Sequence, residues 1–96
     1  MSDHEIETEL QEGRGRYVIR DGGMEAELTF SISSPTLRIA DHTGVPEDWR
    51  GEGAGLALVR HLVDDARAQG FKIVPLCPFV NRMRARHPEW ADVFAV

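Results

Sequence analysis

The chain has 96 residues, 42% of them hydrophobic. This length is enough for one domain with one hydrophobic core and too short for two domains. No stretch approaches the roughly 20 apolar residues that span a bilayer, and no basic segment at the start precedes an apolar run, so the sequence predicts a cytoplasmic protein without signal peptide or membrane helix. The single cysteine, Cys77, cannot form an internal disulfide or by itself a metal site, which fits a reducing compartment.

The net charge of −5 argues against general nucleic-acid binding, but the charge is unevenly spread. Residues 1–49 carry four Arg or Lys against eleven Asp or Glu, whereas residues 50–96 carry seven against five. The second half therefore suits an anionic ligand. The first half would suit a cationic acceptor near Asp41, Glu47 and Asp48; the alternative is that these carboxylates form an ordinary solvated surface.

The first third of the chain predicts a β-hairpin. Residues 1–13 are polar and acidic, which indicates a frayed end or a short edge strand. Arg16–Arg20 is rich in β-branched and aromatic residues, and Met24–Ser33 alternates apolar and polar side chains. Asp21-Gly22-Gly23 between them is a strong turn signal, so these two segments are expected to pair as an antiparallel hairpin.

A third strand is expected at Thr36–Val45, because Ser33-Ser34-Pro35 breaks the preceding pattern. Within this strand Leu37 and Ile39 should point to the same face. The three strands together predict an antiparallel meander.

The segment Gly55–Gln69 predicts an amphipathic helix. Its apolar residues recur at intervals of three and four: Leu56, Val59, Leu62, Val63 and Ala66. Gly70 is expected to end the helix as a left-handed cap. Phe71–Leu76 is short, apolar and β-branched, which predicts a buried strand parallel to the third strand and completes a β-α-β unit.

Two prolines delimit a second helix. Pro78 can open it, and Pro88 limits it at about His87. The residues of this region that are expected to pack on the core are apolar: Phe79, Val80, Met83, Trp90, Val93 and Phe94.

The turn between the third strand and the first helix contains three alternating glycines, Gly51, Gly53 and Gly55. Without Cβ atoms the backbone can adopt left-handed conformations and approach a ligand closely, and the first helical turn offers amides with no partner inside the helix. Such a turn binds anions, diphosphate above all. It is not a dinucleotide fingerprint, which would need glycine at Leu56 or Leu58, nor a P-loop, which would need Gly-Lys followed by Ser or Thr.

The six residues Arg50–Gly55 instead fit R/Q-x-x-G-x-G/A, which resembles the acyl-coenzyme A loop of the GNAT superfamily of N-acyltransferases. Asp41–Pro46 before the loop, and Pro75–Val80 and Arg86–Glu89 after it, are similar to the minimal branch of small GNAT-like acetyltransferases. That branch lacks the usual N-terminal helical region and carries a single cysteine after the strand that follows the loop. The resemblance covers about residues 15–94.

The resemblance implies one domain over residues 1–96 with an α/β (α+β) fold of the minimal GNAT type. This fold is an antiparallel meander followed by a β-α-β unit with splayed strands and a C-terminal helix. It implies acetyl-CoA as cofactor, with the pantetheine arm between the splayed strands and the diphosphate at the glycine turn. The residues expected to bind the cofactor are Thr43, Gly44, Val45, Arg50, Gly51, Gly53, Ala54, Gly55 and Asn81.

The basic residues of the second helix are further candidates for contact with the nucleotide phosphate: Arg82, Arg84, Arg86 and His87. The alternative for these residues, and for Asn81, is a solvated helix surface.

Cys77 and His42 are the candidate catalytic residues. The resemblance places Cys77 at the acetyl end of the cleft, either lining it or acting as a transient acetyl carrier; the alternative is plain packing. His42 titrates near neutral pH and could relay a proton; the alternative is a histidine that anchors a strand end by hydrogen bonds. Where related sequences tend to place a tyrosine on the last helix, this chain has Met83, which has no acidic proton for a departing thiolate.

The predicted function is therefore an acetyl-CoA-dependent N-acetyltransferase that acts on an unidentified amine, either a small molecule or a peptide. The alternative, prompted by Met83, is an acyl-CoA binding or sensing module with reduced or no catalytic activity. A third hypothesis is a nucleic-acid or protein adaptor that uses the arginine-rich last helix, and the acidic balance of the chain disfavours it. Neither a metal nor a membrane partner is predicted.

Overall fold

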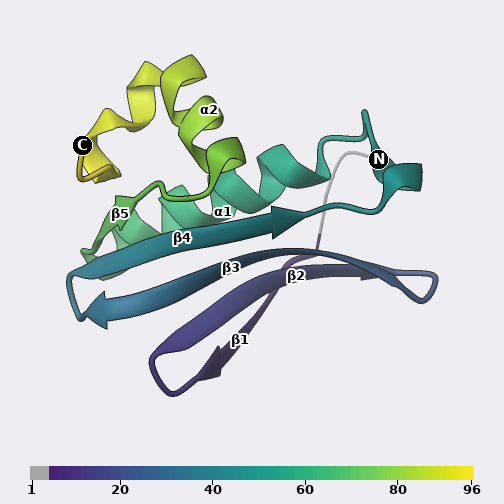
Figure 1. Cartoon of the computed structure of the whole chain (residues 1–96), viewed down its shortest axis with the longest axis horizontal. Coiled ribbons are helices and arrows are strands. Elements are labelled where there is room, and N and C mark those ends of the chain that lie inside the picture. Colours follow the sequence, from purple (N-terminus) through teal and green to yellow (C-terminus); the bar gives the residue numbers. More distant parts are fainter. Residues whose placement is uncertain (1–4) are drawn as a thin grey trace.

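A computed structural model describes residues 5–96, in which a five-stranded sheet carries two α-helices (Figure 1). The strands are β1 (Glu7–Gln11), β2 (Arg14–Asp21), β3 (Met24–Ser34), β4 (Leu37–Gly44) and β5 (Lys72–Val74). The helices are α1 (Ala54–Gln69) and α2 (Pro78–Arg86), with 3₁₀ turns at Glu47–Trp49 and Pro88–Val93.

The strands lie in the order β1-β2-β3-β4-β5. All neighbours are antiparallel except β4 and β5, which are parallel and joined through α1. The predicted meander and β-α-β unit are thus confirmed. β1 is the short edge strand expected within residues 1–13, while residues 1–4, where a frayed end was also expected, lie outside the described residues.

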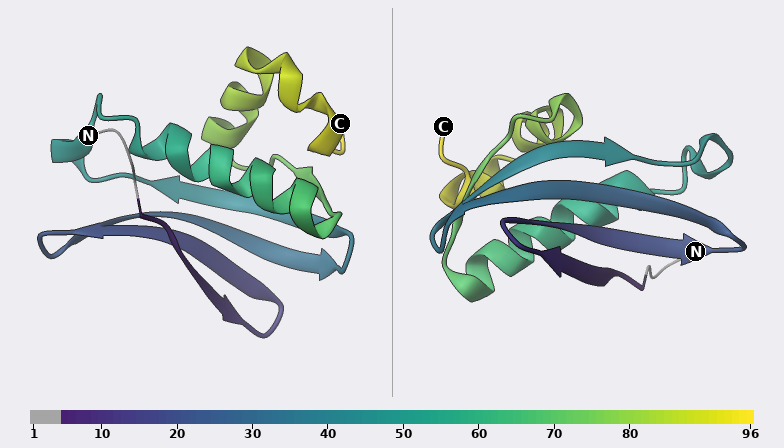
Figure 2. Two further views of the ribbon diagram at one scale, coloured as in Figure 1. Left: turned by 180° about the vertical axis from the view of Figure 1, so that it is seen from behind. Right: turned by 60° about the horizontal axis from the view of Figure 1, so that its bottom comes forward.

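The core lies between the sheet and α1, which crosses one face of it (Figure 2, left). We call this the inner face. The strands contribute alternating residues to it: Tyr17, Ile19, Ala26, Leu28, Phe30 and Ala40. Trp90, Val93 and Phe94 are also buried, as predicted. Gly70 ends α1 with φ of 79°, and its amide donates to the carbonyl of Ala66 at 2.8 Å, as expected of a left-handed cap.

Helix α1 begins at Ala54, and its buried stripe differs at one place from the predicted one. Leu58, which was not expected in the stripe, is fully buried, whereas Leu56 is half-buried. Leu58, Leu62 and Ala66 repeat every four residues along the face that packs on the sheet. Leu56 instead lines a groove at the start of the helix.

Strand β5 is shorter than the predicted strand Phe71–Leu76. The amide of Leu76, the next one due to bond β4, turns back to the carbonyl of Val74 at 3.0 Å. Leu76 is 67% exposed, so the prediction of a buried strand was wrong at this end.

The inner face of β4 places a charged side chain in the core, which was not predicted. Leu37 and Ile39 share the other face as expected, so Arg38 points inward and is only 9% exposed. Its guanidinium lies 4.0 Å from the ring centroid of Phe71, and its Nη1 donates to the Tyr17 hydroxyl at 3.3 Å.

Asp65 of α1 completes this buried cluster. The Tyr17 hydroxyl donates to Asp65 Oδ2 at 2.5 Å, and Arg38 Nη1 lies 3.4 Å from the same oxygen. The arginine, phenol and carboxylate satisfy one another, which is the condition for burying polar groups without a large penalty. The cluster ties the sheet to α1.

Removing the Tyr17 hydroxyl tests this cluster. Tyr17→Phe should lower the free energy of unfolding by about 1–3 kcal/mol at neutral pH, because Asp65 loses a buried donor. Burial and the hydrogen bond to Asp65 raise the pKa of the Tyr17 phenol above its usual value of 10.0. The wild type should therefore lose up to about 1.4 kcal/mol per pH unit above about pH 10, and Tyr17→Phe should lack that part of the slope.

Denaturant unfolding from neutral to alkaline pH measures both effects. Tyr17 is the only tyrosine, so phenolate absorbance reports its ionisation alone. Ionisation of the native protein at the ordinary phenol pKa would contradict the prediction.

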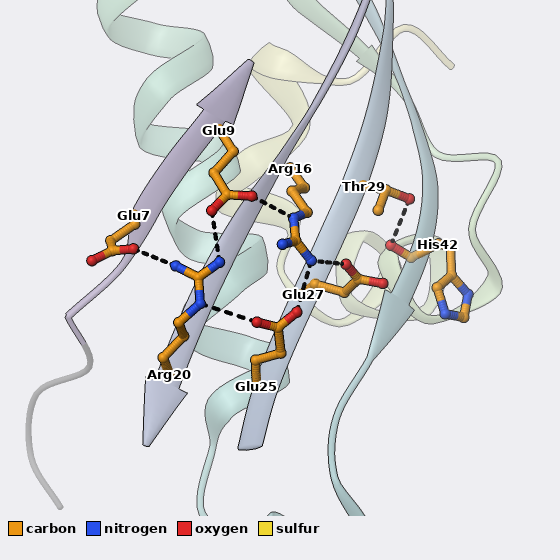
Figure 3. Close-up of polar contacts among 8 residues, drawn as sticks. All are labelled: Glu7, Glu9, Arg16, Arg20, Glu25, Glu27, Thr29 and His42. Atoms are coloured by element: carbon orange, nitrogen blue, oxygen red, sulfur yellow. Dashed lines mark hydrogen bonds and ion pairs between the residues drawn. The ribbon is translucent and has the colours of Figure 1, made fainter. Parts of the chain in front are cut away.

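The opposite, outer face of β1–β3 carries an ion-pair network (Figure 3). Arg16 pairs with Glu9, Glu25 and Glu27, and Arg20 pairs with Glu7, Glu9 and Glu25, at N–O distances of 2.6–3.0 Å. Hydrogen bonds from Arg20 and Arg16 lower the pKa of the Glu9 carboxyl, and bonds from Arg16 and Arg20 lower that of Glu25. Both carboxylates therefore favour the folded state above their unfolded pKa of about 4.5, and that contribution is lost on acidification.

Candidate functional site

Strands β4 and β5 pair over only three residues each. Leu37–Ile39 pairs with Lys72–Val74. Two further bonds, both of 2.8 Å, run from the Lys72 amide to the Thr36 carbonyl and from the Cys77 amide to the Ala40 carbonyl. β4 continues to Gly44, so its last residues run past the end of β5 (Figure 1). The last residues of β4 therefore have no partner in β5.

A β-bulge at Asp41 sets the direction of the side chains in this free part of β4. Phe30 of β3 lies opposite Ala40, whereas Thr29 lies opposite His42, so Asp41 is an extra residue on β4. Without the bulge, regular alternation from Ala40 would place His42 on the inner face. With it, His42 points to the outer face and Thr43 to the inner face.

A groove of about 670 Å³ lies beside the free end of β4, between the glycine turn and α2. Seven of the nine predicted cofactor-binding residues line it: Thr43, Val45, Arg50, Gly51, Gly53, Ala54 and Gly55. Its other lining residues are Trp49, Leu56, Phe79, Arg82 and Met83. The volume is within the range of small-molecule and cofactor sites.

The three glycines of the turn are required for two different reasons. Gly51 and Gly53 have φ of 86° and 81°, and a Cβ at either would meet nothing within 4 Å. Glycine is needed there for the left-handed backbone. Gly55 lies inside α1, where a Cβ would come within 2.8 Å of Phe79 Cζ, so glycine is needed there to let α2 pack closely.

The start of α1 offers free amides to the groove. The first helical hydrogen bond runs from the Ala57 amide to the Gly53 carbonyl at 2.9 Å, so the amides of Ala54, Gly55 and Leu56 precede the helical ladder. Gly53 has no side chain to cap them, and the first turn contains no acidic residue. The helix dipole and these amides favour an anion in the groove.

Cys77 lies next to the groove without being one of its lining residues. It is 3% exposed, and its Sγ is 3.4 Å from Oγ1 of Thr43, which does line the groove. The thiol therefore contacts the groove wall through Thr43.

The structure does not bring His42, Gly44 or Asn81 to the groove wall. His42 is exposed on the outer face beside Thr29, whose hydroxyl donates to the His42 carbonyl at 3.4 Å (Figure 3). A Cβ at Gly44 would lie 3.3 Å from His42 Nε2, which places the imidazole over this glycine. Asn81 is exposed on α2, where its Oδ1 accepts a hydrogen bond from Arg84 at 3.0 Å.

Trp49 and Phe79 were missed as site residues. Trp49 directly precedes the glycine motif, and its aromatic side chain in a polar turn was the available signal. Phe79 packs against the core as predicted, as a half-buried side chain, and it also lines the groove. Within residues 5–96 no cluster of three or more His, Cys, Asp or Glu side chains could hold a metal ion. The same part of the chain contains no helix long and apolar enough to cross a membrane.

The contact between Gly55 and Phe79 is open to a direct test. Gly55→Ala should cost little stability, because the Phe79 ring can rotate, but it should push the ring into the groove and weaken ligand binding about tenfold or more. The double variant Gly55→Ala/Phe79→Leu should recover binding, since the smaller side chain leaves room for the new methyl group. Titration of both variants with acetyl-CoA measures this, and failure of Phe79→Leu to rescue binding would contradict the assigned role of Gly55.

Comparison with known proteins identifies the family. The family model of GCN5-related N-acetyltransferases matches residues 16–93. A GCN5-like protein from Staphylococcus aureus, provisionally assigned as an N-acetyltransferase and determined in solution by NMR, matches with a TM-score of 0.73 and 30% identity. The match covers 98% of this chain and 90% of that one. The comparison with curated proteins gave no match. The chain belongs to the GCN5-related N-acetyltransferase family, which makes it an acyltransferase and confirms the predicted GNAT-like fold.

Proposed function

We propose that this family member transfers the acetyl group of acetyl-CoA to an amine of a small molecule or peptide. The observation that carries the proposal is the groove, in which an anion-binding turn and a free strand end face the same space. These are the two features that a cofactor with a diphosphate and an amide-rich arm requires.

The residues present fit acetyl-CoA. Gly51 and Gly53 leave open space above their backbone, and Arg50 adds a positive charge for the diphosphate. The backbone of Thr43–Val45 extends past β5, so its polar groups are available to the pantetheine arm. When bound, acetyl-CoA supplies a thioester whose carbonyl carbon is open to attack by a neutral amine.

Acetyl transfer also requires stabilisation of the departing thiolate and a route for the proton of the amine. Met83 lines the groove on α2 and cannot donate a proton. The Thr43 hydroxyl, 3.4 Å from the Cys77 thiol, is a hydrogen-bond donor on the groove wall. We assign to Thr43 the hydrogen bond to the leaving sulfur, with Cys77 holding its hydroxyl in place. His42 points to the outer face, away from the groove wall, so we assign it no step at the thioester.

Acetyl-CoA binding and turnover test the proposal directly. Acetyl-CoA at about a hundred times its Kd should stabilise the fold by about 2.7 kcal/mol, and NAD should not. Gly53→Asp should abolish this stabilisation, because it places a carboxylate where the diphosphate must approach. Gly13→Asp is the matched control, since Gly13 also has positive φ (76°) and open space but lies at the β1–β2 turn. Thermal unfolding with each ligand measures the shift.

The outcomes separate the candidate functions. A folded wild type with no acetyl-CoA shift would remove the proposed function. Binding without release of CoA across a panel of amines would favour the acyl-CoA binding or sensing module instead. Equal shifts for wild type and Gly53→Asp would show that the glycine turn does not hold the diphosphate.

Cys77 is expected to support the site without carrying the acetyl group, because its thiol is buried behind Thr43. Cys77→Ala should keep acetyl-CoA binding, and kcat should fall by less than about 100-fold, the lower limit for loss of a catalytic acid or base. Mass spectrometry of the wild type with acetyl-CoA should show no acetylated Cys77. An acetyl-Cys77 that forms and is consumed when amine is added, with no turnover in Cys77→Ala, would overturn direct transfer.

A further inference from the structure

Two arginines on the groove lack an acidic partner. Across residues 5–96 no carboxylate lies within 4.0 Å of the guanidinium of Arg50 or Arg82, although both line the groove. By contrast, the arginines that hold the fold together are each paired with a carboxylate: Arg16, Arg20, Arg38 and Arg67. An unpaired cation that lines a groove is suited to an anionic ligand.

The two free arginines stand on different walls. Arg50 belongs to the glycine turn, beside the amides at the start of α1, whereas Arg82 belongs to α2. The glycine turn therefore offers Arg50 and the free amides to one anionic group of a ligand. Arg82 on α2 is available to a second anionic group.

Arg82 differs from the other basic residues of α2. The Arg84 Nε is engaged with Asn81 Oδ1 at 3.0 Å, and Arg86 is exposed and does not line the groove. The guanidinium carbon of Arg82 lies 6.0 Å from the ring centroid of Phe79, another lining residue. Arg82 is thus the basic residue that α2 contributes to the groove.

Coenzyme A carries two separate anionic groups, the diphosphate and a phosphomonoester on the ribose. A phosphomonoester bears about −1.5 to −2 charge at neutral pH and offers three acceptor oxygens, which matches a free guanidinium. We propose that Arg82 binds the ribose 3′-phosphate of coenzyme A and makes the enzyme select the phosphorylated cofactor over dephospho-coenzyme A. This inference rests on the proposed function, and Arg82 is its specificity-determining residue.

Calorimetric titration with CoA and dephospho-CoA at one fixed salt concentration tests the assignment. The wild type should bind CoA about 10- to 100-fold more tightly than dephospho-CoA, the range expected for a charge-assisted hydrogen bond. Arg82→Gln should lose that preference, because the substitution should weaken the binding of CoA and leave the binding of dephospho-CoA unchanged. Arg82→Lys should keep part of it, because the charge remains while the planar fork is lost.

Two matched variants give the controls. Arg50→Gln should weaken the binding of both ligands by similar factors, since both contain the diphosphate. Arg86→Gln, on the same helix as Arg82 and outside the groove, should bind both ligands as the wild type does. The unliganded melting temperature of Arg82→Gln should equal that of the wild type, because Arg82 has no carboxylate partner in residues 5–96.

Equal wild-type affinity for the two ligands would overturn the proposal. Two results for Arg82→Gln would also overturn it. Equal weakening of the binding of both ligands would mean that Arg82 contacts the diphosphate. A change in the KM of the amine alone would mean that Arg82 contacts the acceptor. A wild type that binds neither ligand would instead overturn the proposed function itself.

Discussion

The hydrogen-bond ladder between β4 and β5 ends at Val74, and the groove depends on this early end. The Lys72 amide donates to the Thr36 carbonyl, and every second residue of β5 faces β4, so the amide of Leu76 is the next one due to continue the ladder. It turns back to the carbonyl of Val74 instead. The bond from Cys77 to the Ala40 carbonyl then fixes where α2 begins relative to β4. The free end of β4 follows from this early end of the ladder, and the bond from Cys77 sets the position of α2 beside it.

The glycine turn closes the groove from the other side, and its three glycines have different functions. Two of them allow a left-handed backbone around the free amides at the start of α1. Gly55 allows Phe79 to pack against the helix and so brings α2, with Arg82 and Met83, to the groove. The glycine motif therefore has two functions: it forms the anion-binding turn, and it allows α1 and α2 to pack closely.

Much of the fold could be predicted from the sequence because its signals are local. Alternation in β3, the Gly22-Gly23 turn, the helical period of α1 and the prolines around α2 each act over a few residues, and each element was placed within about two residues. Arg38 could not be predicted, because its partners Tyr17 and Asp65 are 21 and 27 residues away in the chain. The charge is tolerated in the core only in the presence of those two side chains.

The candidate site shows the same division between local and distant information. The glycine motif located the turn and five of the twelve residues that line the groove, and the family resemblance added Thr43 and Val45. The side-chain directions of His42 and Thr43 could not be predicted from the sequence. The bulge at Asp41 reverses the alternation of side chains between the two faces of β4, and no residue type marks a bulge of this kind. Arg82 could not be separated from Arg84 and Arg86 by sequence, since only the packing of α2 decides which of the three meets the groove.

Pairing, rather than the count of charges, determines what each surface of this acidic protein can bind. On the outer face Arg16 and Arg20 are both engaged by several carboxylates, so their positive charge is already neutralised within the sheet. On the groove Arg50 and Arg82 have no such partners among residues 5–96, and the helix start beside them contains no acidic residue in its first turn. A chain with a net charge of −5 can therefore present a cationic groove, because no carboxylate of residues 5–96 pairs with the two arginines that line it.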